Sequence, residues 1–297
     1  MGIDAGGSKT VAYLAGGAGQ IVGEGRAGGA NLQAHGELEV EKALHHAIEQ
    51  ALGDRDVTIA AICLGIAGVD RPDEVHIVSS MLRRLGFKTR VLIVNDALIA
   101  LVAATDEEPG IVVISGTGSI AYGLSSKGVA ARAGGWGSVL GDEGSGYWMG
   151  RRALVAVMRA FDGRGPATEL TQLMLEHFNV TRPDGLVREI YDRPVARRAI
   201  AATGLIVERA RAAGDLVASE ILADAASEIG ESVRSVATRL GMRGEPFRTV
   251  LAGGMFKAIP WLVADVTRRL EEIVPRSTAI LLEVEPAVGA VRLALRE

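Results

Sequence analysis

The chain has 297 residues, of which 48% are hydrophobic, and this length allows two domains of ordinary size with a substantial core. Its formal net charge is −4 at pH 7, with acidic and basic residues mixed along the chain, which excludes a typical nucleic-acid-binding protein with a basic stripe. Cys63 is the only cysteine, which excludes an internal disulfide and a structural zinc site built on cysteines.

Residue patterns predict three strands at the start of the chain, followed by a loop that carries Asn31. A helix is predicted from Gly36 to Gly53, because apolar residues recur along one of its faces. A nearly continuous apolar run from Val57 to Ile66 predicts a buried central strand. The elements of the first half are, in chain order, strands 2–5, 10–15 and 20–26, helix 36–53, strand 57–66, helix 71–85, strand 90–94 and helix 97–104.

The same order of elements begins again after a polar break at residues 106–110. A second glycine turn, "SGTGS" at 115–119, again lies between the first two of three strands. The elements predicted here are strands 111–114, 120–124 and 129–132, a helical stretch from 143 to 240 with breaks at 163–166, 183 and 214, strand 249–251, helix 261–273, strand 279–282 and a final helix from 286. We therefore predict an internally duplicated α/β protein whose two domains, 1–108 and 109–297, face each other across a cleft.

The first glycine turn nearly matches a phosphate-binding Walker loop, but its lysine is displaced by one residue. Gly2 and Gly7 have the Walker spacing, yet Ser8 separates Gly7 from Lys9. A strand is predicted after Thr10, whereas a Walker loop opens a helix. The sequence therefore predicts a β-hairpin whose backbone N–H groups line an anion-binding nest, with an ordinary glycine-rich hairpin as the alternative.

Several segments together indicate a nucleotide site, although each one alone is more typical of a plain turn. The two glycine turns offer backbone amides to the phosphates, and they offer the hydroxyls of Ser8, Thr10, Thr117 and Ser119. Asp4, at the end of the first strand, is placed to hold Mg²⁺ through water. The segment "LAGGMF" follows a strand and opens a helix, and its Gly253 and Gly254 let an adenine ring approach the backbone.

Two longer stretches carry a resemblance to a known family. "GGWGSVLGDEGSGYWMG" (Gly134–Gly150) looks like a sugar loop followed by an acidic helix start, and "EPAVGAVRLAL" (Glu285–Leu295) resembles a C-terminal helix that returns to the first domain. Together with the turns, they resemble the sugar kinase, hsp70 and actin superfamily, in particular N-acetylglucosamine kinase-like sugar kinases of the BadF/BadG/BcrA/BcrD ATPase group. The resemblance covers essentially the whole chain, and it implies two ribonuclease H-like (actin-like ATPase) domains, each with a βββαβα core.

The resemblance also implies roles for individual residues. Asp96, in "VND", matches the catalytic base. The residues expected to bind ATP are Gly6, Gly7, Ser8, Lys9, Thr10, Gly116, Thr117, Gly118, Ala210, Gly253, Gly254, Met255 and Ala258. Those expected to bind the sugar are Asn31, Asn95, Asp96, Ser119, Gly135, Trp136, Gly137 and Asp142.

Structural explanations of these residues stay open at the level of sequence. Asp96 could be the N-cap of the helix that follows it. Asp142 and Glu143 could be helix-start residues that the helix dipole favours. Asn31 could be a turn residue and Lys9 a solvated lysine of the hairpin. The arginine-rich run 193–211 is typical of a solvated helix face.

The predicted function is phosphorylation of a hexose or amino sugar with ATP and Mg²⁺, and the first hypothesis is conversion of N-acetylglucosamine to its 6-phosphate with Asp96 as general base. A broad-specificity hexokinase, a glucosamine kinase and an N-acetylmuramate kinase are alternatives. An ATPase that activates a CoA reductase or dehydratase is disfavoured, because its iron–sulfur cluster needs two cysteines per subunit and this chain has only Cys63. A non-catalytic sugar sensor is a further alternative.

The expected partner is a small-molecule sugar, and neither a nucleic acid nor a membrane is expected. The longest apolar stretch, 57–69, is too short and too rich in glycine for a membrane-spanning helix. We therefore expect a cytoplasmic protein, and the resemblance implies a homodimer.

Overall fold

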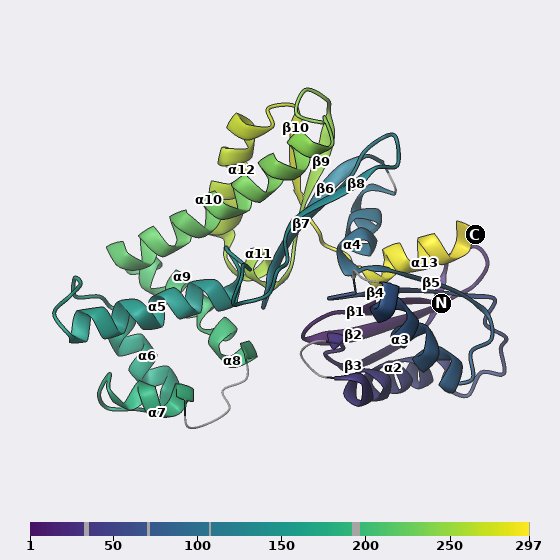
Figure 1. The fold of residues 1–297 in the computed structure, drawn as a ribbon, viewed down its shortest axis with the longest axis horizontal. Helices are drawn as coiled ribbons and strands as arrows, with labels where there is room; N and C mark the ends of the chain where they lie inside the picture. The colour runs from purple at the N-terminus through teal and green to yellow at the C-terminus, as the bar shows by residue number, and fades with distance from the viewer. Residues whose placement is uncertain (33–35, 70–71, 107, 192–196, 297) are drawn as a thin grey trace. The chain divides into compact units, whose positions relative to one another are not determined.

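The structure is a computed structural model, and it describes the chain except for residues 33–35, 70–71, 107, 192–196 and 297 (Figure 1). The chain folds into two compact units. Unit 1 consists of residues 1–112 and 282–297, and unit 2 consists of residues 113–281. The C-terminal segment therefore belongs to the same unit as the N-terminus.

Unit 1 is built on a five-stranded sheet with the strand order β3-β2-β1-β4-β5. Its first three strands form an antiparallel meander, and β1, β4 and β5 run parallel to one another. The elements of this unit are β1 (Gly2–Ala5), β2 (Lys9–Ala15), β3 (Ile21–Gly28), α2 (Glu37–Leu52), β4 (Ala61–Ile66), α3 (Pro72–Arg84), β5 (Arg90–Asn95), α4 (Asp96–Thr105) and α13 (Ala287–Arg296).

Unit 2 repeats this arrangement with the strand order β10-β9-β6-β7-β8. In each unit the first strand is central, the next two strands lie on one side of it and the last two lie on the other side. The strands are β6 (Gly110–Ser115), which carries the boundary of the units, β7 (Ser119–Leu124), β8 (Ala130–Gly134), β9 (Phe247–Ala252) and β10 (Ser277–Leu281). The shared strand order confirms the predicted duplication and the α/β fold class.

The helices of unit 2 follow the predicted helical regions. They are α5 (Gly146–Phe161), α6 (Leu170–Phe178), α7 (Gly185–Tyr191), α8 (Arg197–Ala202), α9 (Gly204–Ala212), α10 (Leu216–Arg239), α11 (Gly254–Ala258) and α12 (Pro260–Ile273). The predicted breaks near residues 163–166, 183 and 214 all fall between helices.

The start of β4 is predicted four residues too early, because the strand begins at Ala61 rather than at Val57. Ala61 pairs with Arg90, the first residue of β5, so that the ladder to that neighbouring strand starts there. Val57 is 47% exposed. An apolar run predicts burial, but it does not say where the neighbouring strand begins.

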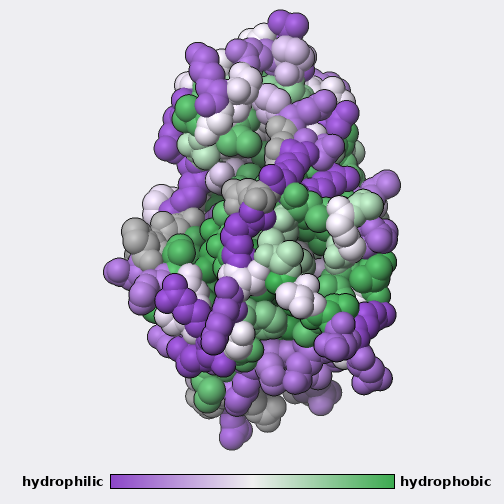
Figure 2. Space-filling view, turned by 90° about the vertical axis from the view of Figure 1, so that its right-hand side faces the viewer, coloured by the Kyte–Doolittle hydropathy of each residue, from purple (hydrophilic) through white to green (hydrophobic). Residues whose placement is uncertain are grey.

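The surface mixes hydrophobic and hydrophilic residues, as the face in Figure 2 shows. On unit 1, Ile21 and Val22 are both 42% exposed. They lie on β3, an edge strand of the unit 1 sheet.

Across the described part of the chain, each helix is too short or too polar to cross a lipid bilayer.

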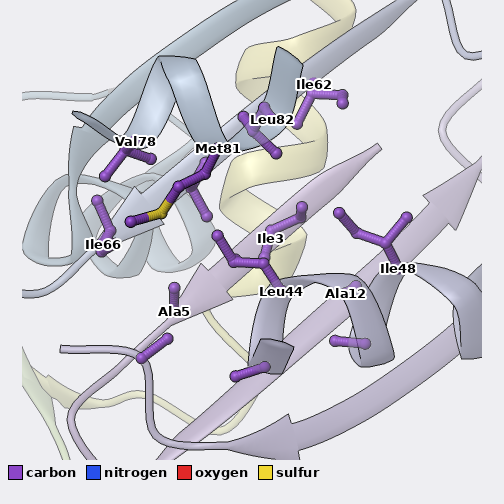
Figure 3. Close-up of a cluster of buried hydrophobic side chains, with 14 of the residues drawn as sticks. Ile3, Ala5, Ala12, Leu44, Ile48, Ile62, Ile66, Val78, Met81 and Leu82 are labelled. Atoms are coloured by element: carbon purple, nitrogen blue, oxygen red, sulfur yellow. The ribbon is translucent and has the colours of Figure 1, made fainter. Parts of the chain in front are cut away.

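The main core of unit 1 lies between one face of its sheet and helices α2 and α3, and Figure 3 shows some of its side chains. Ile3 of β1 and Ile62 of β4 are completely buried, together with Leu44 of α2 and Met81 of α3. Burying a side chain of this size contributes about 1.5–3 kcal/mol. These contacts fix the strands whose ends carry the candidate residues.

Helix α13 packs against β1 and α4 through two close backbone approaches. A Cβ atom at Gly2 would lie 2.7 Å from the carbonyl oxygen of Ala287, and one at Gly289 would lie 2.7 Å from the amide nitrogen of Ala103. Only glycine allows backbones to come this close. The glycines therefore anchor the C-terminal helix within unit 1.

Candidate functional site

The carboxyl ends of three parallel strands bring the candidate residues of unit 1 to one edge of its sheet. Asp4 is the third residue of β1, and Asp96 directly follows β5. The Asn31 side-chain amide donates a hydrogen bond to the carbonyl oxygen of Ala67, just after β4 (3.3 Å). Because β1, β4 and β5 are parallel, these ends lie at the same edge.

The turn between β1 and β2 carries the first glycine cluster. The N–H of Gly6 donates to the carbonyl oxygen of Lys9 (3.0 Å), and the N–H of Ala30 donates to the carbonyl oxygen of Gly6 (2.9 Å). Gly7 is exposed, and a Cβ atom there would meet no atom of the described residues within 4 Å. The tip of the turn is therefore open to a ligand, as the nest prediction requires, and Ser8 beside it is half-buried.

The Thr10 hydroxyl forms its hydrogen bond within the sheet rather than at the open tip of the turn. It is completely buried, and its hydroxyl donates to the carbonyl oxygen of Gly28 (2.8 Å), which ties β2 to β3. Lys9 is half-exposed, but its ammonium group is bound by the carboxylate of Glu285 (2.6 Å). Lys9 is therefore an ion-paired residue in this structure rather than a purely solvated one.

Asp4 is a buried acid beside other acids. Its residue is only 6% exposed, and burial raises its pKa to about 8, with the negative charges of Asp96 and Glu285 acting in the same direction and Lys9 opposing them. Such a group is protonated or balanced by a cation. Carboxylate oxygens suit Mg²⁺, so the side chain of Asp4 fits this ion.

The described residues hold no group of three or more His, Cys, Asp or Glu side chains that could bind a metal. A cation at Asp4 would therefore take its other ligands from water or from phosphate oxygens. Mg²⁺ commonly keeps several waters, so a sparse protein ligand set is consistent with it.

Asn95, not Asp96, caps helix α4. The side-chain oxygen of Asn95 accepts a hydrogen bond from the N–H of Ala97 (2.9 Å), and Asp96 is the first residue of the helix. The alternative in which Asp96 is the N-cap is therefore wrong. Asp96 is half-buried at this position.

The second glycine turn, in unit 2, is anchored on the loop that precedes α5. The N–H of Gly116 donates to the carbonyl oxygen of Gly118 (2.9 Å), and the N–H of Gly146 donates to that of Gly116 (2.9 Å). The Ser115 hydroxyl donates to the carbonyl oxygen of Gly144 (2.8 Å), and the Ser119 hydroxyl to that of Glu143 (2.6 Å). Thr117, at the tip, is half-buried.

Asp142 lies behind this turn and is almost completely buried, with 4% of its side chain exposed. It adopts a left-handed backbone conformation (φ 62°), and its carboxylate forms an ion pair with Arg197. Burial raises the pKa of Asp142, whereas Arg197 and hydrogen bonds from the N–H groups of Ser119 and Gly137 lower it. Helix α5 begins at Gly146 with Ser145 as its N-cap, so the alternative in which Asp142 stands at the helix start is wrong.

The predicted sugar loop is exposed. Trp136 is 61% exposed, and the guanidinium group of Arg132 lies 4.1 Å from the centre of its ring. Gly135 and Gly137 both have positive φ values, and the N–H of Gly135 donates to the carbonyl oxygen of Ser119 (2.9 Å). The loop is therefore joined to the strand that follows the second glycine turn.

The predicted adenosine segment lies beside the same turn. Gly253 has a φ of 102°, and a Cβ atom there would collide with the backbone of Ser115. A Cβ atom at Gly146 would lie 3.0 Å from the sulfur of Met255 and 3.2 Å from the carbonyl oxygen of Gly116. The structure therefore brings the adenosine segment and the second turn together.

The other predicted adenosine residues differ in their exposure. Gly254 and Ala258 are exposed. Ala210 is completely buried within α9, so its side chain has no exposed surface that a nucleotide could contact.

Sequence reasoning missed two partners of the candidate residues. Arg197 was assigned to a solvated helix face, yet it pairs with the buried Asp142, 55 residues away in the chain. Glu285 lies 276 residues from its partner Lys9, so no short sequence spacing links these two residues either. Such long-range pairs leave no periodic signal.

The repeated strand order and the glycine turn after the first strand of each unit define an α/β ATPase of the actin-like class. The chain belongs to the BadF/BadG/BcrA/BcrD ATPase family, whose sequence profile matches residues 1–294. This confirms the resemblance drawn from the sequence.

Two relatives match this chain over nearly its whole length. It is 36% identical over 300 residues to the N-acetylmuramic acid/N-acetylglucosamine kinase of Clostridium acetobutylicum, covering 100% of this chain and 98% of the relative. It is 33% identical over 310 residues to the N-acetyl-D-glucosamine kinase of Dictyostelium discoideum, covering 99% and 97%.

Solved structures agree on the fold. A crystal structure of a Chromobacterium violaceum protein matches with a TM-score of 0.77 and 26% identity, covering 99% of this chain and 97% of that one. A ROK family glucokinase from Streptomyces griseus shares the fold with a TM-score of 0.60 at 16% identity, covering 99% and 97%.

Proposed function

We propose that this protein is an ATP-dependent kinase that phosphorylates N-acetylglucosamine on its 6-hydroxyl group. The observation that carries the proposal is the whole-length similarity, at 36% and 33% identity, to two kinases that are both named for this sugar. The open glycine turns and the carboxylates at the sheet edge of unit 1 supply the groups that such a reaction needs.

In the proposed reaction, Asp96 accepts the proton of the attacking sugar hydroxyl. Asn31, on the loop after β3, and the sugar loop around Trp136 bind the sugar, and the amides of the two glycine turns bind phosphate oxygens. ATP supplies the phosphoryl group when bound, and Mg²⁺, held through Asp4, offsets its charge. The protein's own contribution is mainly positioning and charge stabilisation.

The test is sugar-dependent ADP release by the purified protein with Mg-ATP and a panel of hexoses and amino sugars. N-acetylglucosamine is expected to stimulate release most, with a 6-phosphate as product. Asp96→Asn should lower kcat by roughly 100-fold or more while ATP binding survives. The exposed Asp56 provides the matched control Asp56→Asn, which should keep full activity.

Undiminished turnover by Asp96→Asn would remove Asp96 as the base. If no sugar increases ADP release by the unaltered protein, the kinase proposal fails and the sugar sensor becomes the better hypothesis.

N-acetylmuramate is a second candidate substrate, because the Clostridium acetobutylicum relative is named for both sugars. Including this sugar in the panel decides whether one site accepts both. An activator ATPase finds no support, since Cys63 is completely buried and offers no thiolate to a shared cluster.

A homodimer and a cytoplasmic location belong to the same proposal, as the family resemblance and the composition led us to expect. Sedimentation of the purified protein tests the dimer.

A further inference from the structure

The carboxylate of Asp142 joins three segments of unit 2. It accepts hydrogen bonds from the backbone N–H of Ser119, the last residue of the second glycine turn, and from that of Gly137, in the sugar loop. It also forms an ion pair with Arg197, the first residue of α8. With only 4% of its side chain exposed, this carboxylate is held by protein donors rather than by water.

The ion pair lies directly against the glycine turn. A Cβ atom at Gly118 would lie 2.8 Å from the Asp142 carboxylate and 3.1 Å from the Arg197 guanidinium. The turn and the sugar loop are also linked to each other, because the N–H of Gly135 donates to the carbonyl oxygen of Ser119 (2.9 Å). The position of this ion pair therefore affects the position of both segments.

Among the described residues, Arg197 has few other stabilising contacts. Within the described ranges its Nε atom is buried and has no hydrogen-bond partner, and its guanidinium group is 5.8 Å from the centre of the Tyr147 ring. A buried donor without a partner costs free energy, so the attraction of Asp142 has to offset that cost.

We propose that Arg197 is a positioning residue which, through its ion pair with Asp142, holds the second glycine turn (115–119) and the sugar loop (135–137) in the arrangement that phosphorylation requires. The inference rests on the proposed function, because that proposal assigns these two segments to phosphate and sugar. Arg197 acts through Asp142 and needs no contact with either substrate.

Charge explains why the arginine is needed. Desolvation penalises the ionised carboxylate, and Glu143 on the same loop adds a second unfavourable negative charge. Arg197, from α8, is the positive charge that opposes both. Without it the pKa of Asp142 rises further, which favours the neutral acid, and a neutral acid accepts hydrogen bonds from Ser119 and Gly137 less strongly.

The test compares Arg197→Met and Arg197→Lys with the matched control Arg198→Met, an exposed arginine one residue along α8. Arg197→Met should lower kcat/KM for the sugar by about 10- to 100-fold at pH 7, because small displacements of binding groups have effects of this size. The acidic limb of its pH profile should move to higher pH. Arg197→Lys should restore much of the loss, and Arg198→Met should match the unaltered protein.

A second measurement does not depend on catalysis. Hydrogen exchange at the amides of Ser119 and Gly137 should accelerate in Arg197→Met, while exchange in the β1–β5 sheet of unit 1 stays unchanged. This readout remains informative if no sugar proves to be a substrate, so failure of the proposed function and failure of this inference are distinguishable.

An unshifted pH profile together with unchanged exchange at these two amides would overturn the inference. If Arg197→Met does not fold, the double variant Asp142→Asn/Arg197→Met decides. A neutral asparagine needs no positive partner, so the double variant should fold and match the single variant Asp142→Asn. An additional loss in the double variant would also overturn the inference.

Discussion

Two aspartates that precede helices in the sequence, Asp96 and Asp142, differ in what surrounds them. The caps of the helices are their neighbours Asn95 and Ser145. Asp96 is half-buried at the edge of the unit 1 sheet, and its negative charge helps to raise the pKa of Asp4. Asp142, in contrast, accepts hydrogen bonds from two backbone N–H groups and pairs with Arg197. The proposed proton transfer by Asp96 and the proposed positioning role of Asp142 both fit these surroundings.

The buried acid Asp4 leads to a prediction that separates stability from function. Asp4→Asn removes a carboxyl group that is buried beside Asp96 and Glu285, so the thermal unfolding temperature should stay the same or rise. The same change removes the proposed Mg²⁺ ligand, so kcat with Mg-ATP should fall at least about tenfold. Thermal unfolding and ADP release measured on one preparation check both outcomes. A less stable variant with full activity would contradict the prediction.

Glu285 leads to a prediction about nucleotide affinity. Its carboxylate binds Lys9 (2.6 Å) beside the first phosphate turn, so it opposes the approach of an anion there. Glu285→Gln should therefore tighten ATP binding by about two- to threefold at low salt, and the gain should shrink as salt is added. Stability should change little, because ion pairs that are this exposed contribute at most about 1 kcal/mol.

Calorimetric titration of ATP at two salt concentrations measures this effect. Glu24→Gln is the matched control, because Glu24 pairs with the same Arg26 that Glu285 contacts but belongs to β3. Equal effects of the two substitutions would mean that the charge beside the turn is not what matters.

At the scale of elements, the short helix α11 begins with two glycines that have different surroundings. Gly253 has a φ of 102°, and a side chain there would collide with Ser115 at the end of β6. Gly254 has open space, with no atom of the described residues within 4 Å of a Cβ position. Only the first glycine is therefore required by the fold.

The corresponding prediction is that Gly253→Ala destabilises the protein by roughly 3 kcal/mol, from backbone strain plus overpacking. Gly254→Ala should be neutral or slightly stabilising, since alanine favours the helix. Chemical denaturation of both variants measures the difference in free energy of unfolding. Equal losses would show that the close approach to Ser115 is relaxed by movement of the loop.

Sequence patterns predict local elements well where the pattern extends over the whole element. The predicted strand 2–5 has the same bounds as β1. The predicted breaks in the helical region also fall where the structure has them, at positions where glycine or proline interrupts the helical pattern. The start of β4 is missed because it depends on where Arg90 of β5 lies. The Asp142–Arg197 pair is missed for the same reason, since a contact across 55 residues is decided by tertiary packing.

At the scale of the whole molecule, the two units share one strand order but differ in what they insert. Unit 1 has α2 between its third and fourth strands, and unit 2 has α5 to α10 at the corresponding place. The chain passes from unit 1 to unit 2 within β6 and returns after β10. Helix α13 therefore completes unit 1, although the whole of unit 2 separates it in sequence from the rest of that unit.

This dependence leads to a prediction about the stability of each unit. Gly289→Val places a side chain against the backbone of α4, where a Cβ atom would lie 2.7 Å from the amide nitrogen of Ala103. Arg292, which donates to the carbonyl oxygens of Val102 and Ala103, would be displaced with the helix. We expect unit 1 to lose roughly 3 kcal/mol, because overpacking and the lost helix contacts add.

Hydrogen exchange resolved by segment measures where that loss falls. Exchange should accelerate in β1, β4 and α4, while β9 and β10 of unit 2 keep their protection, because the elements on which α13 mainly packs (α4, β1, β2 and β4) belong to unit 1. Gly17→Ala is the matched control, since a methyl group there meets no described atom within 4 Å. Equal acceleration in both units would mean that they unfold as one cooperative body and that α13 stabilises the whole chain.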